Sequence, residues 1–213
     1  MKHVVELREV TKKIEKDTVL SSIDVHFESG KIYGIVGKNG SGKTMMFRVM
    51  SGLVKPTYGK ILIDGKELYK EQSLVENLGL IIENEEMDPT LTAFQNLQLL
   101  AGINKKIGVD EIKHAMELVG LDPMDKRKYK KYSLGMRQKA AIAQAIMEDP
   151  DYIFLDEPTN GLDDDTVSDF CEMLLKEKAK GKLIVIASHS KEVIERICDE
   201  YYEMKQGHLE RKN

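Results

Sequence analysis

One eight-residue segment limits the possible folds of this chain more than any other, namely Gly37-Lys38-Asn39-Gly40-Ser41-Gly42-Lys43-Thr44. It matches the pattern G-x-x-x-x-G-K-[ST], follows a strand predicted at Lys31–Val36 and precedes a predicted helix. Its glycines allow backbone N–H groups to turn inward at the helix N-terminus, where they bind phosphate. In such a loop, Lys43 contacts the β- and γ-phosphates of a nucleotide and Thr44 offers its hydroxyl to Mg²⁺. A simple glycine turn before a helix would need neither side chain.

A second apolar strand, predicted at Tyr152–Leu155, is followed directly by two acids, Asp156 and Glu157. Ligands of parallel α/β sheets bind at the carboxyl ends of the strands, so both carboxylates are expected to face the phosphate loop. Asp156 is the candidate holder of Mg²⁺, and Glu157 is the candidate base that polarises an attacking water. Taken alone, two acids before a proline are equally compatible with a structural turn.

The rest of the chain alternates strands and helices, which predicts a mostly parallel sheet. From about Thr90 a helical block interrupts the strands. The capping box formed by Thr92 and Gln95 opens one helix, and Asp110 is the predicted cap of the next. Five further strands are predicted from their apolar patterns: Val4–Val10, Ile23–Phe27, Lys60–Asp64, Leu78–Ile82 and Leu183–Ala187.

Three more helices are predicted in the C-terminal half of the chain. The first covers Lys139–Met147, and the last begins at Ser190. The middle helix ends at Gly181 and has an inward-facing row of apolar residues: Val167, Phe170, Leu174 and Leu175. Because the sequence has no long linker and no internal repeat, all of these elements are assigned to one domain.

Composition and charge exclude several classes of protein. Hydrophobic residues make up 41% of the chain and charged residues 32%, which is ordinary for a folded soluble protein. No apolar run approaches the roughly 18 residues that a membrane-spanning helix needs. The formal net charge of −4 provides no overall basic field for nucleic acid, and we interpret the basic run Lys126–Lys131 as a solvated loop. The first residues lack a signal peptide, and Cys171 and Cys198 lie in helical patterns, so we expect a cytoplasmic protein without disulfides.

The segment Tyr132-Ser133-Leu134-Gly135-Met136-Arg137-Gln138 resembles the signature LSGGQ-x-Q of the ATP-binding subunits of ATP-binding-cassette (ABC) transporters. The resemblance implies that Ser133 and Gly135 form a second anion site, which closes over the γ-phosphate bound by the opposite subunit. Leu134 and Met136 depart from the strict signature, and the variant SLGM is similar to that of bacitracin-resistance and other drug-export ATPases. Without the resemblance, Ser133 would be interpreted as the cap of an alanine-rich helix.

Four further positions take their expected roles from the same resemblance. Asp163 ends a segment, Asn160-Gly161-Leu162-Asp163, that is similar to the D-loop and is expected at the subunit interface, although it also fits a helix cap. His189 is similar to the histidine that touches the γ-phosphate. Glu83 stands where the family has a metal-contacting glutamine, and Ile14 stands where it stacks an aromatic ring on adenine.

The resemblance implies an α/β P-loop NTPase fold of the ABC ATPase type, with a mostly parallel core sheet, an N-terminal antiparallel β subdomain and a helical insertion. Residues 1–84 and 133–213 would form the nucleotide-binding core, and residues 85–132 the insertion. The implied function is to bind and hydrolyse ATP with Mg²⁺, in a pair with an identical or different ABC ATPase subunit. This pair would drive an integral membrane permease, docked on the Glu83–Leu91 loop and the insertion, at the cytoplasmic face of the cell membrane.

Two other functions remain compatible with the sequence. One is a soluble ABC ATPase that does not act in transport, and the other is a nucleotide-gated module with little turnover. The altered signature, Glu83 and Ile14 favour the second alternative, whereas Glu157 and His189 favour an enzyme. No nucleic acid partner is expected.

Overall fold

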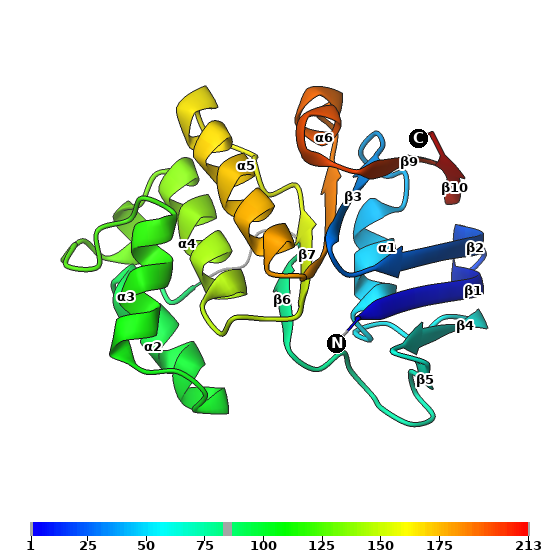
Figure 1. Cartoon of the computed structure of the whole chain (residues 1–213), viewed down its shortest axis with the longest axis horizontal. Helices are drawn as coiled ribbons and strands as arrows, with labels where there is room; N and C mark the ends of the chain where they lie inside the picture. The colour runs from blue at the N-terminus through cyan, green and yellow to red at the C-terminus, as the bar shows by residue number, and fades with distance from the viewer. Residues whose placement is uncertain (1, 83–86, 213) are drawn as a thin grey trace.

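The computed structural model describes residues 2–82 and 87–212, which form two β-sheets and a group of helices (Figure 1). The larger sheet has the strand order β10-β9-β3-β8-β7-β6, in which every neighbouring pair is parallel except β9 with β10. All residues of β7 and β8 are buried, as expected for parallel strands covered on both faces. The strands of this larger sheet are β3 (Lys31–Val36), β6 (Leu78–Ile81), β7 (Tyr152–Asp156), β8 (Leu183–Ser188), β9 (Glu200–Lys205) and β10 (His208–Arg211).

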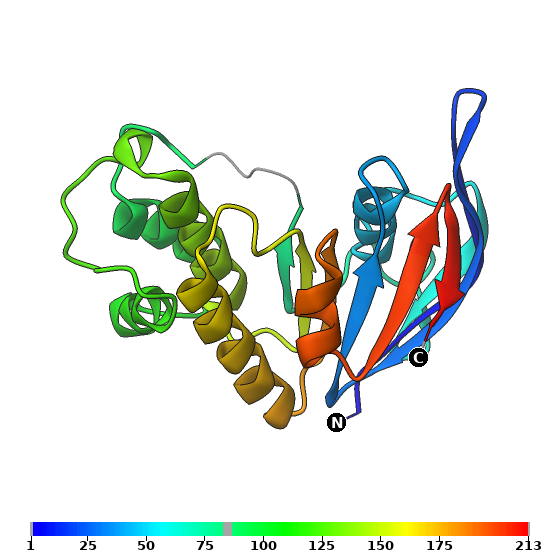
Figure 2. The same ribbon diagram turned by 90° about the horizontal axis from the view of Figure 1, so that it is seen from above.

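The smaller sheet is antiparallel and has the order β2-β1-β4-β5. It is built from β1 (Val4–Ile14), β2 (Asp17–Glu28), β4 (Tyr58–Ile63) and β5 (Lys66–Glu67). Helix α1 (Lys43–Met50) lies between the two sheets, as Figures 1 and 2 show. Its Phe47 ring meets that of Phe154 from β7 edge to face, with ring centroids 6.2 Å apart. One apolar core therefore fixes the helix that follows the phosphate loop against both sheets.

The other helices cover the opposite face of the larger sheet and extend away from it (Figure 2). They are α2 (Ala93–Asn104), α3 (Val109–Leu118), α4 (Leu134–Ile146), α5 (Asp164–Ala179) and α6 (Lys191–Ile197), with a short 3₁₀ turn at Tyr129–Lys131. Helix α4 contacts β6 so closely that a Cβ on Gly79 would lie 2.0 Å from the carbonyl oxygen of Ala145. Within residues 2–82 and 87–212, no helix has the length and hydropathy needed to span a bilayer.

The fold confirms the predicted arrangement of a mostly parallel sheet, an N-terminal antiparallel sheet and an inserted helical group. The strand Lys31–Val36 has the predicted bounds, and the capping box of Thr92 and Gln95 opens α2. Gly181 follows the end of α5 with a φ of +88°, and Ser190 precedes α6, both as predicted.

Three helix predictions were wrong. Helix α3 is capped at Gly108 rather than at Asp110, because the Glu111 carboxylate accepts the backbone N–H of Gly108. Helix α4 begins at Leu134, five residues before the predicted Lys139, because the side chain of Ser133 caps it. Leu175 is 43% exposed rather than inward-facing.

The sequence analysis also missed the C-terminal hairpin of β9 and β10. Its two-residue turn, Gln206-Gly207, has positive φ at both positions, +47° and +79°, as right-twisted strands require. The hairpin lies beside β3 and brings Gly207 to the phosphate loop.

Candidate nucleotide-binding site

The phosphate loop leads from the end of β3 into the first turn of α1, and its glycines are required by its shape. Gly40 and Gly42 have φ angles of +77° and +114°, a region that residues with a Cβ rarely occupy. A Cβ on Gly37 would lie 2.6 Å from both the carbonyl oxygen of Met204 and the hydroxyl of Ser41. The sequence pattern therefore corresponds to a backbone that only glycine fits.

The turn of the C-terminal hairpin supports this loop from outside. The backbone N–H of Gly207 donates to the carbonyl oxygen of Ser41 at 2.9 Å, and the N–H of Ser21 donates to the carbonyl oxygen of Gly207 at 2.9 Å. A Cβ on Gly207 would lie 2.5 Å from the carbonyl oxygen of Val19. Gly207 thus links β2 to the phosphate loop, a role that the sequence alone did not indicate.

Lys43 is held across the loop by three contacts. Its ammonium donates to the carbonyl oxygens of Gly37 at 2.7 Å and Lys38 at 3.4 Å, and lies 3.3 Å from Oε1 of Glu157. Only 5% of the residue is exposed. This buried cation faces the same loop as the inward-turned amides, so it adds positive charge where a phosphate would bind.

Thr44 and Asp156 meet at the end of β7. The Thr44 hydroxyl donates to Oδ2 of Asp156 at 2.5 Å, and Asp156 is 6% exposed. A hydroxyl and a carboxylate are hard oxygen donors, the kind that Mg²⁺ prefers. The pair fits a Mg²⁺ ion that takes its other ligands from phosphate and water.

Glu157 has an unusual backbone conformation, with a φ of +49°. Such a conformation costs of order 1–3 kcal/mol in a non-glycine residue and persists only where neighbours hold it. Here the Glu157 N–H donates to the carbonyl oxygen of Ala187 at 2.8 Å. Its Oε2 accepts the N–H of His189 at 3.2 Å and lies 2.8 Å from that ring's Nδ1. The carboxylate is thereby aimed at Lys43 and His189, with 18% of the side chain still open to solvent.

These groups surround a cavity of about 330 Å³. Inside the loop, the hydroxyl of Ser41 is buried and has no hydrogen-bond partner within the described part of the chain, so a bound phosphate would satisfy it. This is an independent sign that the loop is built for a ligand. The cavity is lined by Val19, Lys38, Asn39, Gly40, Gly42, Lys43, Thr44, Met45, Arg48, Asp156 and Glu157.

Of the predicted site residues that the structure describes, several do not line this cavity, and Gly37, Ser41, His189 and Ile14 are among them. Ile14 is 46% exposed at the tip of the β1–β2 hairpin, where it pairs with Asp17. Val19 is the hairpin residue that reaches the cavity, and the sequence analysis missed it. Glu83 lies outside the described residues.

The signature and D-loop residues form a second group, separate from the cavity. Ser133 caps α4 by accepting the N–H of Met136 at 3.2 Å, and Gly135 lies in the first turn of that helix. Asp163 caps α5 by accepting the N–H of Thr166 at 2.8 Å. Hydrogen bonds from the backbone and the side chain of Thr166 hold the pKa of the Asp163 carboxyl below its usual value. Both helix-cap interpretations are therefore correct for the local structure.

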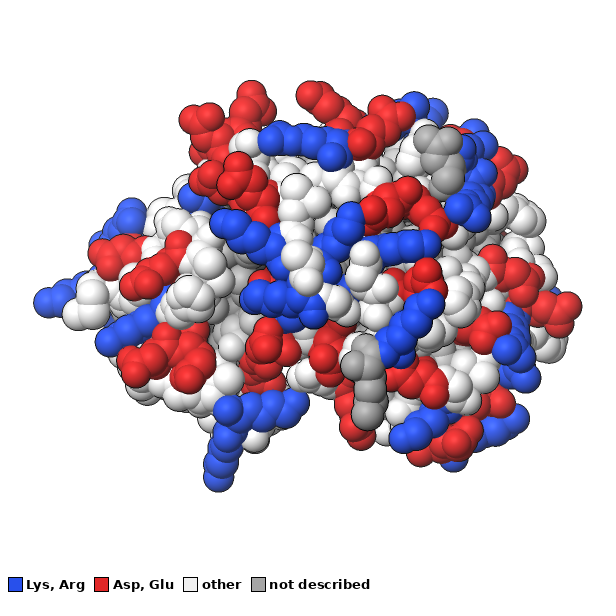
Figure 3. All heavy atoms as spheres, in the orientation of Figure 1, with Lys and Arg blue, Asp and Glu red and all other residues white. Residues whose placement is uncertain are grey.

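The basic run before the signature is partly neutralised by its surroundings. Arg127 forms an ion pair with Asp125 at 2.7 Å and lies over the ring of Tyr132. On the face shown in Figure 3, basic and acidic side chains are interspersed. Among the described side chains on this face, the mixture of both signs gives little attraction for a polyanion.

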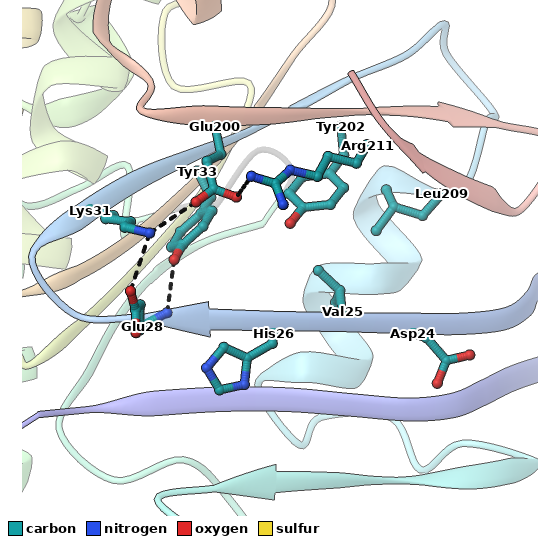
Figure 4. A pocket seen from close by; sticks show the side chains of 10 residues that line it. All are labelled: Asp24, Val25, His26, Glu28, Lys31, Tyr33, Glu200, Tyr202, Leu209 and Arg211. Atoms are coloured by element: carbon teal, nitrogen blue, oxygen red, sulfur yellow. Dashed lines mark hydrogen bonds and ion pairs between the residues drawn. The ribbon is translucent and has the colours of Figure 1, made fainter. Parts of the chain in front are cut away.

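Another hollow, of about 440 Å³, lies between β2, β3, β9 and β10 (Figure 4). Lys31 contacts Glu28 at 3.1 Å and Glu200 at 2.9 Å, and Arg211 contacts Glu200 at 2.8 Å. The hydrogen bonds from its lysine neighbours lower the pKa of Glu28 to about 2. The Tyr33 hydroxyl accepts the N–H of Glu28. These charged side chains form ion pairs with one another. The pairs join neighbouring strands, and their charges are already neutralised rather than offered to a ligand.

A strand–phosphate loop–helix unit, two acids at the end of another strand of the same sheet and an inserted helical group together define the class of ATP-binding cassettes. The family model described as ABC transporter matches residues 20–160, and the chain belongs to this family. It is 47% identical to an uncharacterized ABC transporter ATP-binding protein, YybJ of Bacillus subtilis, over 97% of this chain and 95% of that protein.

Other relatives have descriptions that name a transported compound. The chain is 39% identical to the bacitracin transport ATP-binding protein BcrA of Enterococcus faecalis, over 98% of this chain and 68% of that protein. It is 32% identical to the lantibiotic transport ATP-binding protein SrtF of Streptococcus pyogenes, over 92% of this chain and 84% of that protein.

Among solved structures, the chain is similar to the dimeric structure of the bacterial ABC transporter cassette MJ0796. The TM-score is 0.87 at 26% identity, covering 97% of each chain. A dimeric post-hydrolysis state of that cassette, bound to ADP and Pi, also matches with a TM-score of 0.87 at 26% identity, covering 98% of this chain and 97% of that one.

Proposed function

We propose that this chain binds ATP with Mg²⁺ in the cavity at the phosphate loop, hydrolyses it, and uses the hydrolysis to drive a separate membrane permease. One observation carries the proposal: Lys43, Thr44, Asp156, Glu157 and His189 come from three segments and converge beside one loop. Relatives described as ATP-binding proteins of ABC transporters support ATP as the ligand.

The loop provides the binding half of this chemistry. Its inward-turned amides, the Ser41 hydroxyl and the Lys43 ammonium would bind the β- and γ-phosphates. Thr44 and Asp156 would hold Mg²⁺, which neutralises charge on the phosphate oxygens. Gly37, Lys38, Asn39, Gly40 and Gly42 shape the loop and line or border the cavity.

Glu157 and His189 provide the hydrolytic half. Lys43 contacts one carboxylate oxygen of Glu157, and His189 contacts the other. When a phosphate draws the Lys43 ammonium toward itself, Oε1 of Glu157 becomes free to accept a hydrogen bond from a water molecule. The carboxylate can then orient that water and take up its proton, while His189 keeps the side chain in place.

The signature residues would act on a nucleotide bound by another subunit. Ser133, Gly135 and Asp163 lie outside the cavity that holds Lys43 and Glu157, so they do not complete that site within one chain. In a head-to-tail pair, each signature would close the other subunit's cavity. The similarity to dimeric cassettes supports this pairing, with an identical or a related partner.

We propose that the permease docks in a groove at the C-terminal ends of α2 and α4. It measures about 750 Å³ and lies between the edge strand β6, the end of α2 and the end of α4. Its rim is apolar and open, since Leu74 is 50% exposed and Ile103 is 74% exposed. An amphipathic helix of a membrane protein would cover such a surface. The sequence analysis placed this groove at the Glu83–Leu91 loop and the insertion, and the described residues of that prediction that line it lie from Leu100 to Lys106.

We propose a peptide antibiotic or similar drug as the transported compound, because relatives that match nearly the whole chain are described as bacitracin and lantibiotic transport proteins. The chain would then work at the cytoplasmic face of the cell membrane. Co-purification with a membrane protein from detergent-solubilised membranes tests this role. Recovery of the chain solely from the soluble fraction, with ATPase activity intact, would favour a soluble ABC ATPase instead.

Hydrolysis itself is tested by steady-state phosphate release from the purified chain. A rate that depends on Glu157 supports an enzyme. Tight ATP binding with no release of phosphate above that of the Glu157→Gln variant would favour a nucleotide-gated module.

A further inference from the structure

The signature turn and the D-loop touch each other within one chain. A Cβ on Gly135 would lie 2.8 Å from the carbonyl oxygen of Gly161. A Cβ on Gly161 would lie 2.6 Å from both Cγ and Cδ2 of Leu134. Leu134 is 61% exposed, yet the inner side of its side chain covers the Gly161 backbone. Two glycines thus allow the start of α4 to rest directly on the segment before α5.

The covered segment begins at Glu157, and it is held by the burial of Pro158 and the packing of Leu162 more than by hydrogen bonds of its own. The N–H of Asn160 donates to the carbonyl oxygen of Glu157 at 3.3 Å, and the N–H of Leu162 donates to that of Thr159 at 3.2 Å. Both bonds are long for N–H···O contacts. Gly161 itself has a φ of +76°. A turn with such weak internal bonds depends on what its outer end touches.

We infer that Leu134 is a positioning residue for Glu157, acting through the turn 157–162. Its side chain restrains Gly161, and the turn then adds to the contacts with Ala187 and His189 that hold the strained backbone and the carboxylate of Glu157. Leu134 does not line the cavity that holds Lys43 and Glu157, so its effect on Glu157 of the same chain does not require contact with the nucleotide bound there. The inference rests on the proposed role of Glu157, and it gives a function to a leucine that departs from the family signature.

Replacing Leu134 by alanine tests the restraint directly. In the nucleotide-free chain, where no second copy is held by ATP, Leu134→Ala should speed hydrogen exchange of the amides of Asn160 and Leu162. Leu134→Met should restore slow exchange, because it covers the same backbone. Leu175→Ala, which removes an equally large exposed side chain from α5, should leave the exchange unchanged. Unchanged exchange in Leu134→Ala would overturn the inference.

The catalytic consequence is a split between kcat and KM. A displaced Glu157 should lower kcat about tenfold and leave KM for ATP unchanged. The loss is smaller than the ~10²-fold that a 1 Å displacement of reacting groups can cost. Leu134→Met should recover most of the loss. A raised KM with normal kcat would contradict a positioning role. A wild-type chain without ATPase activity would instead refute the proposed function, and the exchange experiment would still decide whether Leu134 restrains the turn.

A second variant keeps the test independent of truncating Leu134. Gly161→Ala places a Cβ against the Leu134 side chain and should also lower kcat. In the Leu134→Ala background that clash is removed, whereas the cost of the positive φ remains in both backgrounds. The loss caused by Gly161→Ala should therefore be several-fold smaller in the double variant. Strictly additive losses would show that the two residues act separately.

Discussion

Lys43 and Glu157 form an ion pair, but their proposed roles belong to different steps. Lys43 contacts phosphate in the bound state, so Lys43→Ala should weaken ATP binding by about 100-fold, as expected for losing charged hydrogen bonds that are individually worth roughly 1.5–3 kcal/mol. Glu157 acts on the attacking water, so Glu157→Gln should keep ATP affinity and lower the hydrolysis rate by about 10²–10⁴-fold. Calorimetric binding and phosphate release measure the two effects. Equal losses of affinity in both variants would contradict these roles.

Ile14 limits how the base of the nucleotide can be held. Its side chain offers apolar contact but no ring face, and stacking of aromatic groups is worth about 0.5–1.5 kcal/mol beyond burial. Ile14→Tyr should therefore tighten ATP binding by up to about tenfold. Thr18→Tyr is the matched control, because it adds the same ring to the same hairpin at a residue that pairs with Lys13 and does not line the cavity. No change in Ile14→Tyr would mean that the adenine is held elsewhere.

At the scale of elements, a buried charge cluster fixes the end of α5 to the beginning of β8. Lys182 is 7% exposed and Glu177 is 5% exposed, and their charged atoms lie 2.7 Å apart. Asp149 and Lys180 complete the cluster. Helix α5 begins at the D-loop, so this contact anchors the far end of the element that follows the catalytic turn.

Breaking this cluster should destabilise the chain without affecting its nucleotide contacts. Glu177→Ala leaves the buried Lys182 with Asp149 alone, and removing one partner of a buried ion pair costs about 3 kcal/mol. For a chain of this length we expect the melting temperature to fall by roughly 6–12 °C. Glu172→Ala, an exposed glutamate on the same helix, should change it little. A similar fall in melting temperature in both variants would show that the buried cluster contributes no more to stability than an exposed glutamate does.

Elements with a strong local signal could be predicted from the sequence. The glycine pattern dictates the phosphate loop because the φ angles of Gly40 and Gly42 favour glycine, and the strand before it is mostly apolar. The beginning of α4 was predicted too late, because Ser133 was assigned to the signature although the same residue also fitted a helix cap. The hairpin around Gly207 was missed because β9 mixes charged and aromatic residues. The role of Gly207 depends on its hydrogen bond to Ser41, which is far away in the sequence.

The division of the candidate site into two groups also had to come from the fold. Thr44 and Asp156 are distant in sequence but meet because the phosphate loop follows the end of β3 and Asp156 ends β7, at the same edge of one sheet. Ser133 and Asp163 cap neighbouring helices outside the cavity. Residue spacing cannot show which of these groups share a nucleotide, since that depends on the path of the whole chain.

At the scale of the whole molecule, a nucleotide shared between two chains makes assembly depend on ATP. If the γ-phosphate is bound by Lys43 of one chain and by Ser133 of the other, ATP stabilises the pair by mass action and hydrolysis separates it. The chain should therefore be monomeric without nucleotide, and Glu157→Gln with ATP and Mg²⁺ should form a stable dimer. Light scattering coupled to size exclusion measures both states.

The signature residue provides the decisive variant for this assembly. Ser133→Arg puts a bulky cation on the exposed cap of α4, so in the Glu157→Gln background it should keep the chain monomeric while leaving ATP binding to each monomer intact. Met124→Arg makes the same change at a residue that is 69% exposed in the turn after α3, and it should still dimerise. In the otherwise wild-type chain, activity per chain should rise with protein concentration and fall in Ser133→Arg. A rate per chain that is independent of dilution, from a species shown to be monomeric, would refute the shared site, because a monomer cannot bring Ser133 of a second chain to its own γ-phosphate.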